Sequence, residues 1–125
     1  MRYLLDSTFA IDYLRAEPDA VDRLNKLIEA GDEPLISDVV VCEVVTGSPG
    51  DGRGLRALLR GVEFVQPGPE VAVAAGHFRA DARRRGFALG VPDALIAATA
   101  EALGAVVMTR NQRDFALTPV RVETY

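Results

Sequence analysis

The sequence predicts an α/β fold with a short, mostly parallel sheet of four or five strands and helices on both faces. Short apolar runs of strand length alternate with longer segments of helical periodicity, which is the pattern of βαβ units. The length of 125 residues suits one domain, so residues 1–125 are predicted to form a single domain. With 49% hydrophobic and 26% charged residues, the composition is that of a folded protein and excludes global disorder.

The first predicted strand is the apolar run at 3–5, which ends at Asp6. Ser7 or Thr8 can cap the helix that follows, because a hydroxyl oxygen accepts hydrogen bonds from the free N–H groups of a first turn. Pro18 is placed to open a second helix, since proline is favoured at the first helical position.

Residues 34–36 form the second predicted strand. The segment 39–46 that follows is ambiguous, because its valines favour a strand by propensity. A cap at Ser37 or Asp38 and a stop at Gly47 favour a helix instead. We predict a helix here.

The middle of the chain contains the clearest loop, the glycine- and proline-rich stretch 47–52. A short helix at 55–60 and a strand at 62–65 are predicted to follow. A long helix begins at Pro69 and runs to about Gly86.

The last third begins with Pro92 at the first turn of a helix over 93–103. This helix is apolar nearly all round, which is typical of a buried helix. Residues 105–108 form a strand that ends at Thr109. A last strand at 120–122 is expected at an edge of the sheet.

Composition also limits the functions that are open to the chain. No apolar run approaches the roughly 20 residues of a membrane span, and Asp6 interrupts any signal-peptide core. We therefore expect a cytoplasmic protein with no membrane partner. One cysteine and one histidine are too few for a structural zinc site. The net charge of −4 means that a role with nucleic acid needs a local basic patch or a metal ion.

Four acidic residues depart from the polar faces on which most acids lie: Asp6, Glu43, Asp93 and Asp114. Asp6 and Asp114 follow predicted strand ends, where open α/β sheets bind ligands. Ordinary roles are open to three of them: Asp6 and Asp114 as caps, and Asp93 as a favourable charge in a first helical turn. Glu43 is harder to explain, because it interrupts an apolar run and an unpaired buried carboxylate is costly.

Carboxylates gathered at one sheet edge repel one another and have raised pKa values unless a divalent cation neutralises them. An all-oxygen set of ligands suits Mg²⁺ or Mn²⁺. Such an ion can activate water and stabilise both oxygens of an in-line phosphoryl transfer. The acidic residues therefore indicate metal-assisted chemistry on a phosphate ester.

The chain also resembles the PIN-domain nucleases, in particular the VapC-type toxins of bacterial toxin–antitoxin pairs. The resemblance covers essentially the whole chain and is carried by four segments, at 4–8, 43–47, 92–100 and 109–115. It implies a three-layer α/β/α fold and a hydrolase, namely an endoribonuclease that depends on Mg²⁺ or Mn²⁺. It further implies an RNA substrate, neutralisation by a small cognate antitoxin, and a homodimer.

The resemblance also assigns roles to residues by their positions in the motifs. The family's acidic quartet is matched by Asp6, Glu43, Asp93 and Asp114, and its polar supporting positions are matched by Thr109 and Asn111. Asp6 and Asp93 are the predicted direct metal ligands. Arg110 and Arg113 flank the supporting asparagine, and they can hold RNA phosphates or remain solvated surface arginines.

Other candidates are weaker. The arginines of the long predicted helix can also contact RNA; they are Arg79, Arg83, Arg84 and Arg85. Cys42 is expected to be a small core residue rather than a catalytic one. A groove for a partner helix, or ordinary core packing, can be formed by apolar residues of the first two helices, namely Phe9, Tyr13, Leu24 and Leu27.

Two function classes remain after this reading. The first is a metal-dependent endoribonuclease, and the second is a non-catalytic PIN-like module that binds RNA or protein without cleaving it. A phosphoacceptor receiver domain is set aside, because it needs a lysine at a strand end and Lys26 is the only lysine. All four acidic positions are intact, which favours the enzyme.

Overall fold

A single parallel sheet organises the molecule. The computed structural model describes residues 1–47 and 50–125, and in these residues the sheet has five strands in the order β3-β2-β1-β4-β5. The strands are β1 (Arg2–Leu5), β2 (Glu33–Ser37), β3 (Glu63–Val65), β4 (Val106–Met108) and β5 (Val122–Glu123). All four neighbouring pairs are parallel. The predicted α/β fold is confirmed, and the sheet is wholly rather than mostly parallel.

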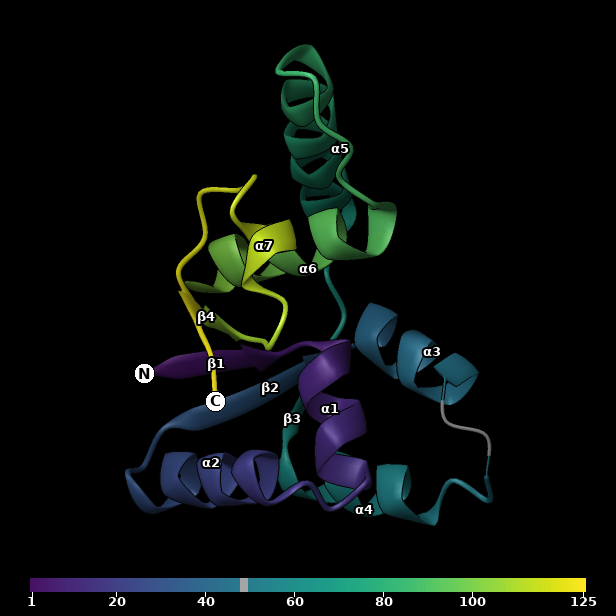
Figure 1. Ribbon diagram of the computed structural model, residues 1–125, viewed down its shortest axis with the longest axis vertical. Helices are drawn as coiled ribbons and strands as arrows, with labels where there is room; N and C mark the ends of the chain where they lie inside the picture. The colour runs from purple at the N-terminus through teal and green to yellow at the C-terminus, as the bar shows by residue number, and fades with distance from the viewer. Residues whose placement is uncertain (48–49) are drawn as a thin grey trace.

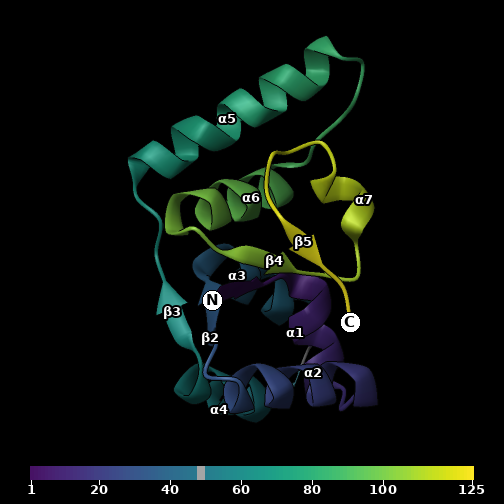
Figure 2. The same cartoon turned by 90° about the vertical axis from the view of Figure 1, so that its left-hand side faces the viewer.

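Helices cover both faces of this sheet. They are α1 (Ser7–Leu14), α2 (Pro18–Glu29), α3 (Asp38–Gly47), α4 (Arg53–Gly61), α5 (Pro69–Arg84), α6 (Val91–Leu103) and α7 (Gln112–Phe115). Figures 1 and 2 show α6 and α7 on one side of the sheet and α2 and α4 on the other. Helix α5 lies beyond α6, on the side that faces away from the sheet.

The helix α6 is sandwiched between two apolar clusters. Its residues Ile96, Ala97 and Ala100 belong to the main core around the sheet. Ala94 and Ala98 belong to a second cluster formed with α5. A helix packed on two sides must be apolar nearly all round, so the predicted burial of this segment is confirmed. Gly104, with φ +61°, ends the helix in the left-handed conformation that glycine adopts most easily.

The ambiguous valine-rich segment is a helix, as predicted. Val40 and Val44 are the buried residues of α3, and their spacing of four places both on the face toward the core. Cys42 lies on the opposite face and is exposed, so the expectation of a core cysteine is wrong. The valine content reflects contact with the core rather than strand propensity.

Several boundaries differ from the prediction. Gly47 ends α3 instead of starting a loop, and residues 48–49 of the predicted loop lie outside the described residues. The last strand is β5 at 122–123 rather than 120–122, because pairing with Val107 and Met108 of β4 fixes its register. Helix α7 was not predicted, since a single helical turn has no periodicity to detect.

The suggested partner groove on the first two helices is wrong. Phe9 and Leu27 are fully buried and Leu24 is 3% exposed, so these side chains form the core. Tyr13 packs against that core from its edge. Ordinary packing, the alternative weighed for these residues, is confirmed. Within the described residues, no helix has the length and apolar character needed to cross a membrane.

Candidate active site

Two neighbouring strands end at the same edge of the sheet and deliver the first site residues. Leu5 of β1 is in register with Met108 of β4, so the next residues, Asp6 and Thr109, emerge side by side. The backbone N–H of Asp6 donates to the Met108 carbonyl at 3.2 Å, which continues the ladder past the strand end. The parallel topology thus places a carboxylate and a hydroxyl together although they are 103 positions apart in the chain.

The Asp6 carboxylate is buried and held by three donors. Its Oδ1 accepts from the Thr8 hydroxyl at 2.7 Å and from the backbone N–H of Phe9 at 3.0 Å. Its Oδ2 accepts from the Thr109 hydroxyl. Asp6 is therefore the N-cap of α1, and the expectation that Ser7 or Thr8 takes this place is wrong. Asp6 has the extended backbone that an N-cap requires, because it ends a strand.

Burial raises the pKa of Asp6 above its usual range, and this effect is the largest one on the group. The hydrogen bonds from Thr109, Phe9 and Thr8 oppose the rise, whereas the negative charge of Glu43 adds to it. A carboxylate with this many donors has a fixed orientation.

Thr109 links Asp6 to the rest of its own loop. Its fully buried hydroxyl donates to Asp6 and accepts from the backbone N–H of Asn111 at 2.8 Å. The Asn111 side-chain amide donates in turn to Oδ2 of Asp114, in the short helix α7. Both residues thus contact the acidic residues that they were predicted to support.

Glu43 projects from α3 and is held from α1. Its Oε1 accepts from the Ser7 hydroxyl at 3.0 Å. The side chain is half-buried rather than fully buried, which removes much of the penalty that the sequence suggested. The hydroxyls of Ser7 and Thr8 orient two of the acids, a role that the sequence reading missed by treating these residues only as helix caps.

Asp93 lies in the first turn of α6 and is half-buried. Its pKa is raised to about 6, first by burial and then by the negative charges of Asp114, Glu43 and Asp6. The four predicted acids therefore share one electrostatic field. In residues 1–47 and 50–125, none of them lies within 4.0 Å of an arginine, lysine or histidine nitrogen.

The fit to a metal ion depends on the donors available. No three His, Cys, Asp or Glu side chains of the described residues are arranged to hold one ion together. Mg²⁺ often takes only one or two carboxylates and keeps several waters, so it does not require such a cage. The acids offer only oxygen ligands, and among the described residues no arginine, lysine or histidine nitrogen lies within 4.0 Å of them. Such a set suits Mg²⁺ or Mn²⁺ bound through one or two carboxylates. The direct ligation by Asp6 and Asp93 stays a prediction.

The arginines predicted to contact RNA fall into two groups. Arg110 forms an ion pair with Asp12, and Arg113 is exposed on α7. On α5, Arg79 donates to the Leu89 carbonyl at 2.9 Å. Arg85 donates to the Leu117 carbonyl at 3.1 Å. Arg79 of α5 and Arg85, the residue that follows this helix, thus contact neighbouring loops, while contact of any of these arginines with RNA stays a prediction.

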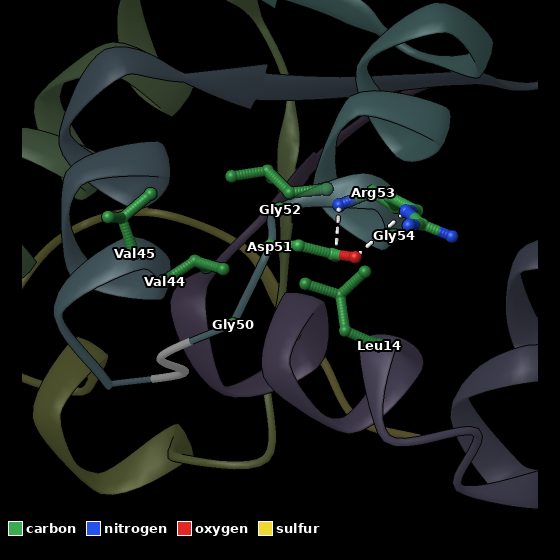
Figure 3. A pocket seen from close by; sticks show the side chains of 9 residues that line it. Leu14, Val44, Val45, Gly50, Asp51, Gly52, Arg53 and Gly54 are labelled. Carbon is green, nitrogen blue, oxygen red and sulfur yellow. Dashed lines mark hydrogen bonds and ion pairs between the residues drawn. The ribbon is translucent and has the colours of Figure 1, made fainter.

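A separate hollow of about 370 Å³ lies between the C-terminal end of α1, helix α3 and the segment before α4 (Figure 3). Leu14, Val44, Val45 and Leu55 give it an apolar lining. Asp51 is bound to Arg53 at its rim, with Oδ2 and Nε 2.8 Å apart. None of the four acids lines this hollow, so it is distinct from the acidic cluster.

A model of the PIN domain matches residues 3–120 of the chain. The chain belongs to the PIN-domain family. Ribonuclease VapC19 of Mycobacterium tuberculosis is 32% identical to this PIN domain over 117 residues, which cover 93% of this chain and 94% of that protein. The tRNA(fMet)-specific endonuclease VapC of Salmonella typhimurium is 27% identical over 133 residues, with coverage of 100% and 98%. The predicted VapC-type resemblance is confirmed.

Solved structures agree with this assignment of the PIN domain. The fold matches VapBC2 from Rickettsia felis, bound to a DNA fragment from its promoter, with a TM-score of 0.87, 22% identity and coverage of 100% and 99%. The DNA-bound VapBC complex of Salmonella typhimurium gives a TM-score of 0.84 at 26% identity, with coverage of 99% and 98%. These matches confirm the three-layer α/β/α architecture.

Proposed function

We propose that this PIN domain is the endoribonuclease toxin of a toxin–antitoxin pair, and that it needs Mg²⁺ or Mn²⁺ to hydrolyse RNA. The observation that carries the proposal is the grouping of Asp114, Glu43 and Asp6 around Asp93, whose pKa is raised to about 6 by burial and then by the negative charges of these three acids. Burial of like charges is unfavourable for folding. A bound cation would neutralise these charges and could act on a phosphate ester. The similarity to VapC ribonucleases supports this proposal.

A bound Mg²⁺ or Mn²⁺ would supply an activated water and would stabilise the charge that develops on the phosphate. The residues of the chain hold and orient the acids that attract the ion. Thr8 and Thr109 fix both oxygens of Asp6, and Asn111 fixes one oxygen of Asp114. At neutral pH, Asp93 is mostly ionised despite its raised pKa of about 6, so it is available as a ligand.

The same residues favour attack by water over attack by the RNA 2′-hydroxyl. Use of the 2′-hydroxyl calls for general acid and base side chains, most often histidines. His77, the one histidine of the chain, lies on α5 beside Phe78 and faces a hollow shared with Glu101 of α6. Hydrolysis by water leaves a 5′-phosphate and a 3′-hydroxyl.

The test is cleavage of a transfer RNA and of an unstructured RNA by the purified protein, with Mg²⁺, Mn²⁺ or EDTA. We expect cleavage with either metal, loss of cleavage in EDTA, and ligation-competent 5′-phosphate ends. Undiminished cleavage in EDTA, or 2′,3′-cyclic phosphate ends, would contradict the metal mechanism. Tight RNA binding without cleavage under any metal would favour the alternative, a non-catalytic PIN-like module.

The partner of this toxin is an antitoxin protein, as in the VapBC complexes to which the chain is similar. The groove suggested for a partner on the first two helices is excluded, because its residues form the core. The apolar hollow between α1, α3 and α4 is instead the surface that suits an apolar segment of that partner. The proposal includes a cytoplasmic location, since RNA and antitoxin are both found there.

A homodimer completes the proposal, and apolar side chains that face solvent support it. Val73 on α5 is 60% exposed, Phe87 after α5 is 56% exposed, and Val91 at the start of α6 is 48% exposed. Such residues are more favourable in an interface than in water. Light scattering should give a mass of two chains at micromolar concentration, and a monomer mass would remove this part of the proposal.

A further inference from the structure

A cleft of about 390 Å³ opens directly beside the acidic cluster. It is lined by Thr8, Ile11, Asp12, Arg15, Arg110 and Asn111. Two of these residues bind the acids themselves, since Thr8 donates to Asp6 and Asn111 donates to Asp114. The cleft is therefore continuous with the site at which RNA would be cut.

The charge of this cleft is opposite to that of its neighbour. Arg15 and Arg110 outweigh the single carboxylate of Asp12, whereas four carboxylates make up the adjoining cluster. Among the described residues, Arg15 forms no ion pair within 4.0 Å. An acidic chain of net charge −4 thus places two guanidinium groups next to its candidate metal site.

Arg110 is held in this cleft from three sides. Its Nε lies 3.1 Å from Oδ2 of Asp12, and its Cζ lies 4.7 Å from the centre of the Tyr125 ring. Its backbone N–H donates to the Thr8 hydroxyl at 3.3 Å. A guanidinium has five N–H donors, so one carboxylate leaves several of them for a ligand.

Tyr125 connects this arginine to the core. Its ring meets the fully buried Phe9 ring edge-on, with centroids 4.8 Å apart and planes at 82°. Its hydroxyl donates to the same Asp12 oxygen at 2.6 Å. Burial and Asp12 raise the pKa of Tyr125 to about 12, so the hydroxyl keeps its proton at neutral pH. The guanidinium therefore rests on a rigid support instead of moving freely at the surface.

We propose that this cleft binds the RNA phosphate next to the one that is cleaved, through Arg110 and Arg15, and that Tyr125 and Asp12 are positioning residues for Arg110. The proposal rests on the function proposed above. A fixed guanidinium suits phosphate because two parallel N–H donors match two phosphate oxygens. Fixing it before RNA arrives reduces the entropy lost on binding.

The first experiment measures cleavage kinetics with Mg²⁺ for Arg110→Gln and Arg15→Gln, with Arg60→Gln on α4 as an exposed control. For Arg110→Gln we expect KM to rise about tenfold with kcat within about twofold, the scale of one charged hydrogen-bonded contact. Arg15→Gln should show a smaller rise, and Arg60→Gln should behave as wild type. Melting temperatures verify that each variant is folded.

A second experiment isolates binding from catalysis. In an Asp93→Asn background without metal, the affinity for a fluorescein-labelled single-stranded RNA is measured over a series of salt concentrations. Loss of the Arg110 contact should reduce the slope of log affinity against log salt by about 0.7 to 1, as expected for one phosphate. A slope and a KM that both stay unchanged would overturn the proposal.

A double-mutant cycle tests the positioning role of Tyr125. Tyr125→Ala should raise KM nearly as much as Arg110→Gln, and the double variant should add little more, because both act on one contact. Tyr125→Phe keeps the ring and should lie between Tyr125→Ala and wild type. Additive effects would show that Tyr125 acts independently of Arg110 and would overturn its assigned role.

The same protein variants and RNA distinguish two further outcomes. If polyglutamate binding depends on Arg110 while RNA binding does not, the cleft takes an acidic peptide, and the proposal is wrong. If the wild-type protein cleaves no RNA with either metal, the proposed function fails and the inference about the cleft is overturned with it. If the wild-type protein cleaves RNA normally and the variants behave like it, only the inference about the cleft is wrong.

Discussion

Asp6, which follows β1, and Asp93, in the first turn of α6, belong to the same acidic cluster but have opposite surroundings. Asp6 is 2% exposed, yet both of its oxygens accept hydrogen bonds from the chain. Asp93 is less buried, and its pKa is raised to about 6 by burial and by three neighbouring acids. Hydrogen bonds from the chain offset part of the cost of the first charge, whereas burial and the neighbouring acids all act against the second.

We therefore expect Asp6 to matter mainly for folding and Asp93 mainly for the chemistry of the site. Asp6 closes the first turn of α1 and joins β1 to the loop after β4, so its removal affects folding. Asp93 lies in a first helical turn that Pro92 and Gly90 already define, so its removal affects mainly charge. Each of the following predictions tests one side of this comparison, from the largest expected effect to the smallest.

The largest effect is expected on cleavage. Asp93→Asn keeps the shape of the side chain but removes one negative charge from the candidate metal site. RNA cleavage with Mg²⁺ should fall by at least about a hundredfold, the scale for disturbed metal coordination. Glu70→Gln, at an exposed acid in the first turn of α5, is the control and should cleave normally. If Asp93→Asn cleaves like wild type, Asp93 is only a helix-start residue.

The second effect is on folding. Asp6→Ala deprives Phe9 of its cap and leaves the hydroxyls of Thr8 and Thr109 without their acceptor. We expect a loss of about 2 kcal/mol of unfolding free energy, from a lost cap and unsatisfied buried donors. Urea unfolding in EDTA measures this, and Asp6→Asn should lose less because it keeps one acceptor oxygen. An unchanged midpoint would mean that these hydrogen bonds contribute little.

The smallest effect concerns stability without metal, where Asp93 is expected to be unfavourable. Its pKa rises from an ordinary value near 3.8 to about 6 on folding, so the folded state binds more protons than the unfolded state between these values. Stability therefore falls as pH increases from about 4 to about 6. Asp6 has a raised pKa of the same sign, so Asp93→Asn should make this fall smaller without abolishing it.

Thermal melts in EDTA at pH 4, 5, 6 and 7 measure this slope. At pH 7, Asp93→Asn should melt about 1 °C above wild type, because relief of repulsion from three acids exceeds the roughly 0.3–1 kcal/mol by which a helix N-terminus favours a carboxylate. A lower melting temperature together with lost cleavage would retain the site and contradict the repulsion.

Much of the fold followed from local patterns. The strand ends, the prolines at helix starts and the all-apolar segment of α6 predicted most elements to within a few residues, because each pattern has one stable local solution. The acids were found because Glu43 interrupts an apolar run and because Asp6 and Asp114 follow strand ends. Burial and the negative charges of Asp114, Glu43 and Asp6 raise the pKa of Asp93, while the roles of these acids as ligands stay predictions.

Other features depend on contacts between distant segments, which a local pattern does not contain. The register of β5 follows from pairing with β4, and apolar spacing on two helices was equally compatible with a groove and a core. Cys42 was misplaced because alternating small and branched residues do not show which helix face turns inward. The contact of Tyr125 with Arg110 and Asp12 joins parts of the chain that carry no common motif.

The central position of β1 has a consequence for the synthesis of a toxin. Its two neighbours are β2 and β4, and the acceptor of the Thr109 hydroxyl lies 103 positions earlier in the chain. A ribosome releases the segment with Asp6 first and the segments with Thr109 and Asp114 more than 100 residues later. Contacts of such long range form late in folding. A growing chain therefore lacks the complete candidate site until the segment with Asp114 has left the ribosome.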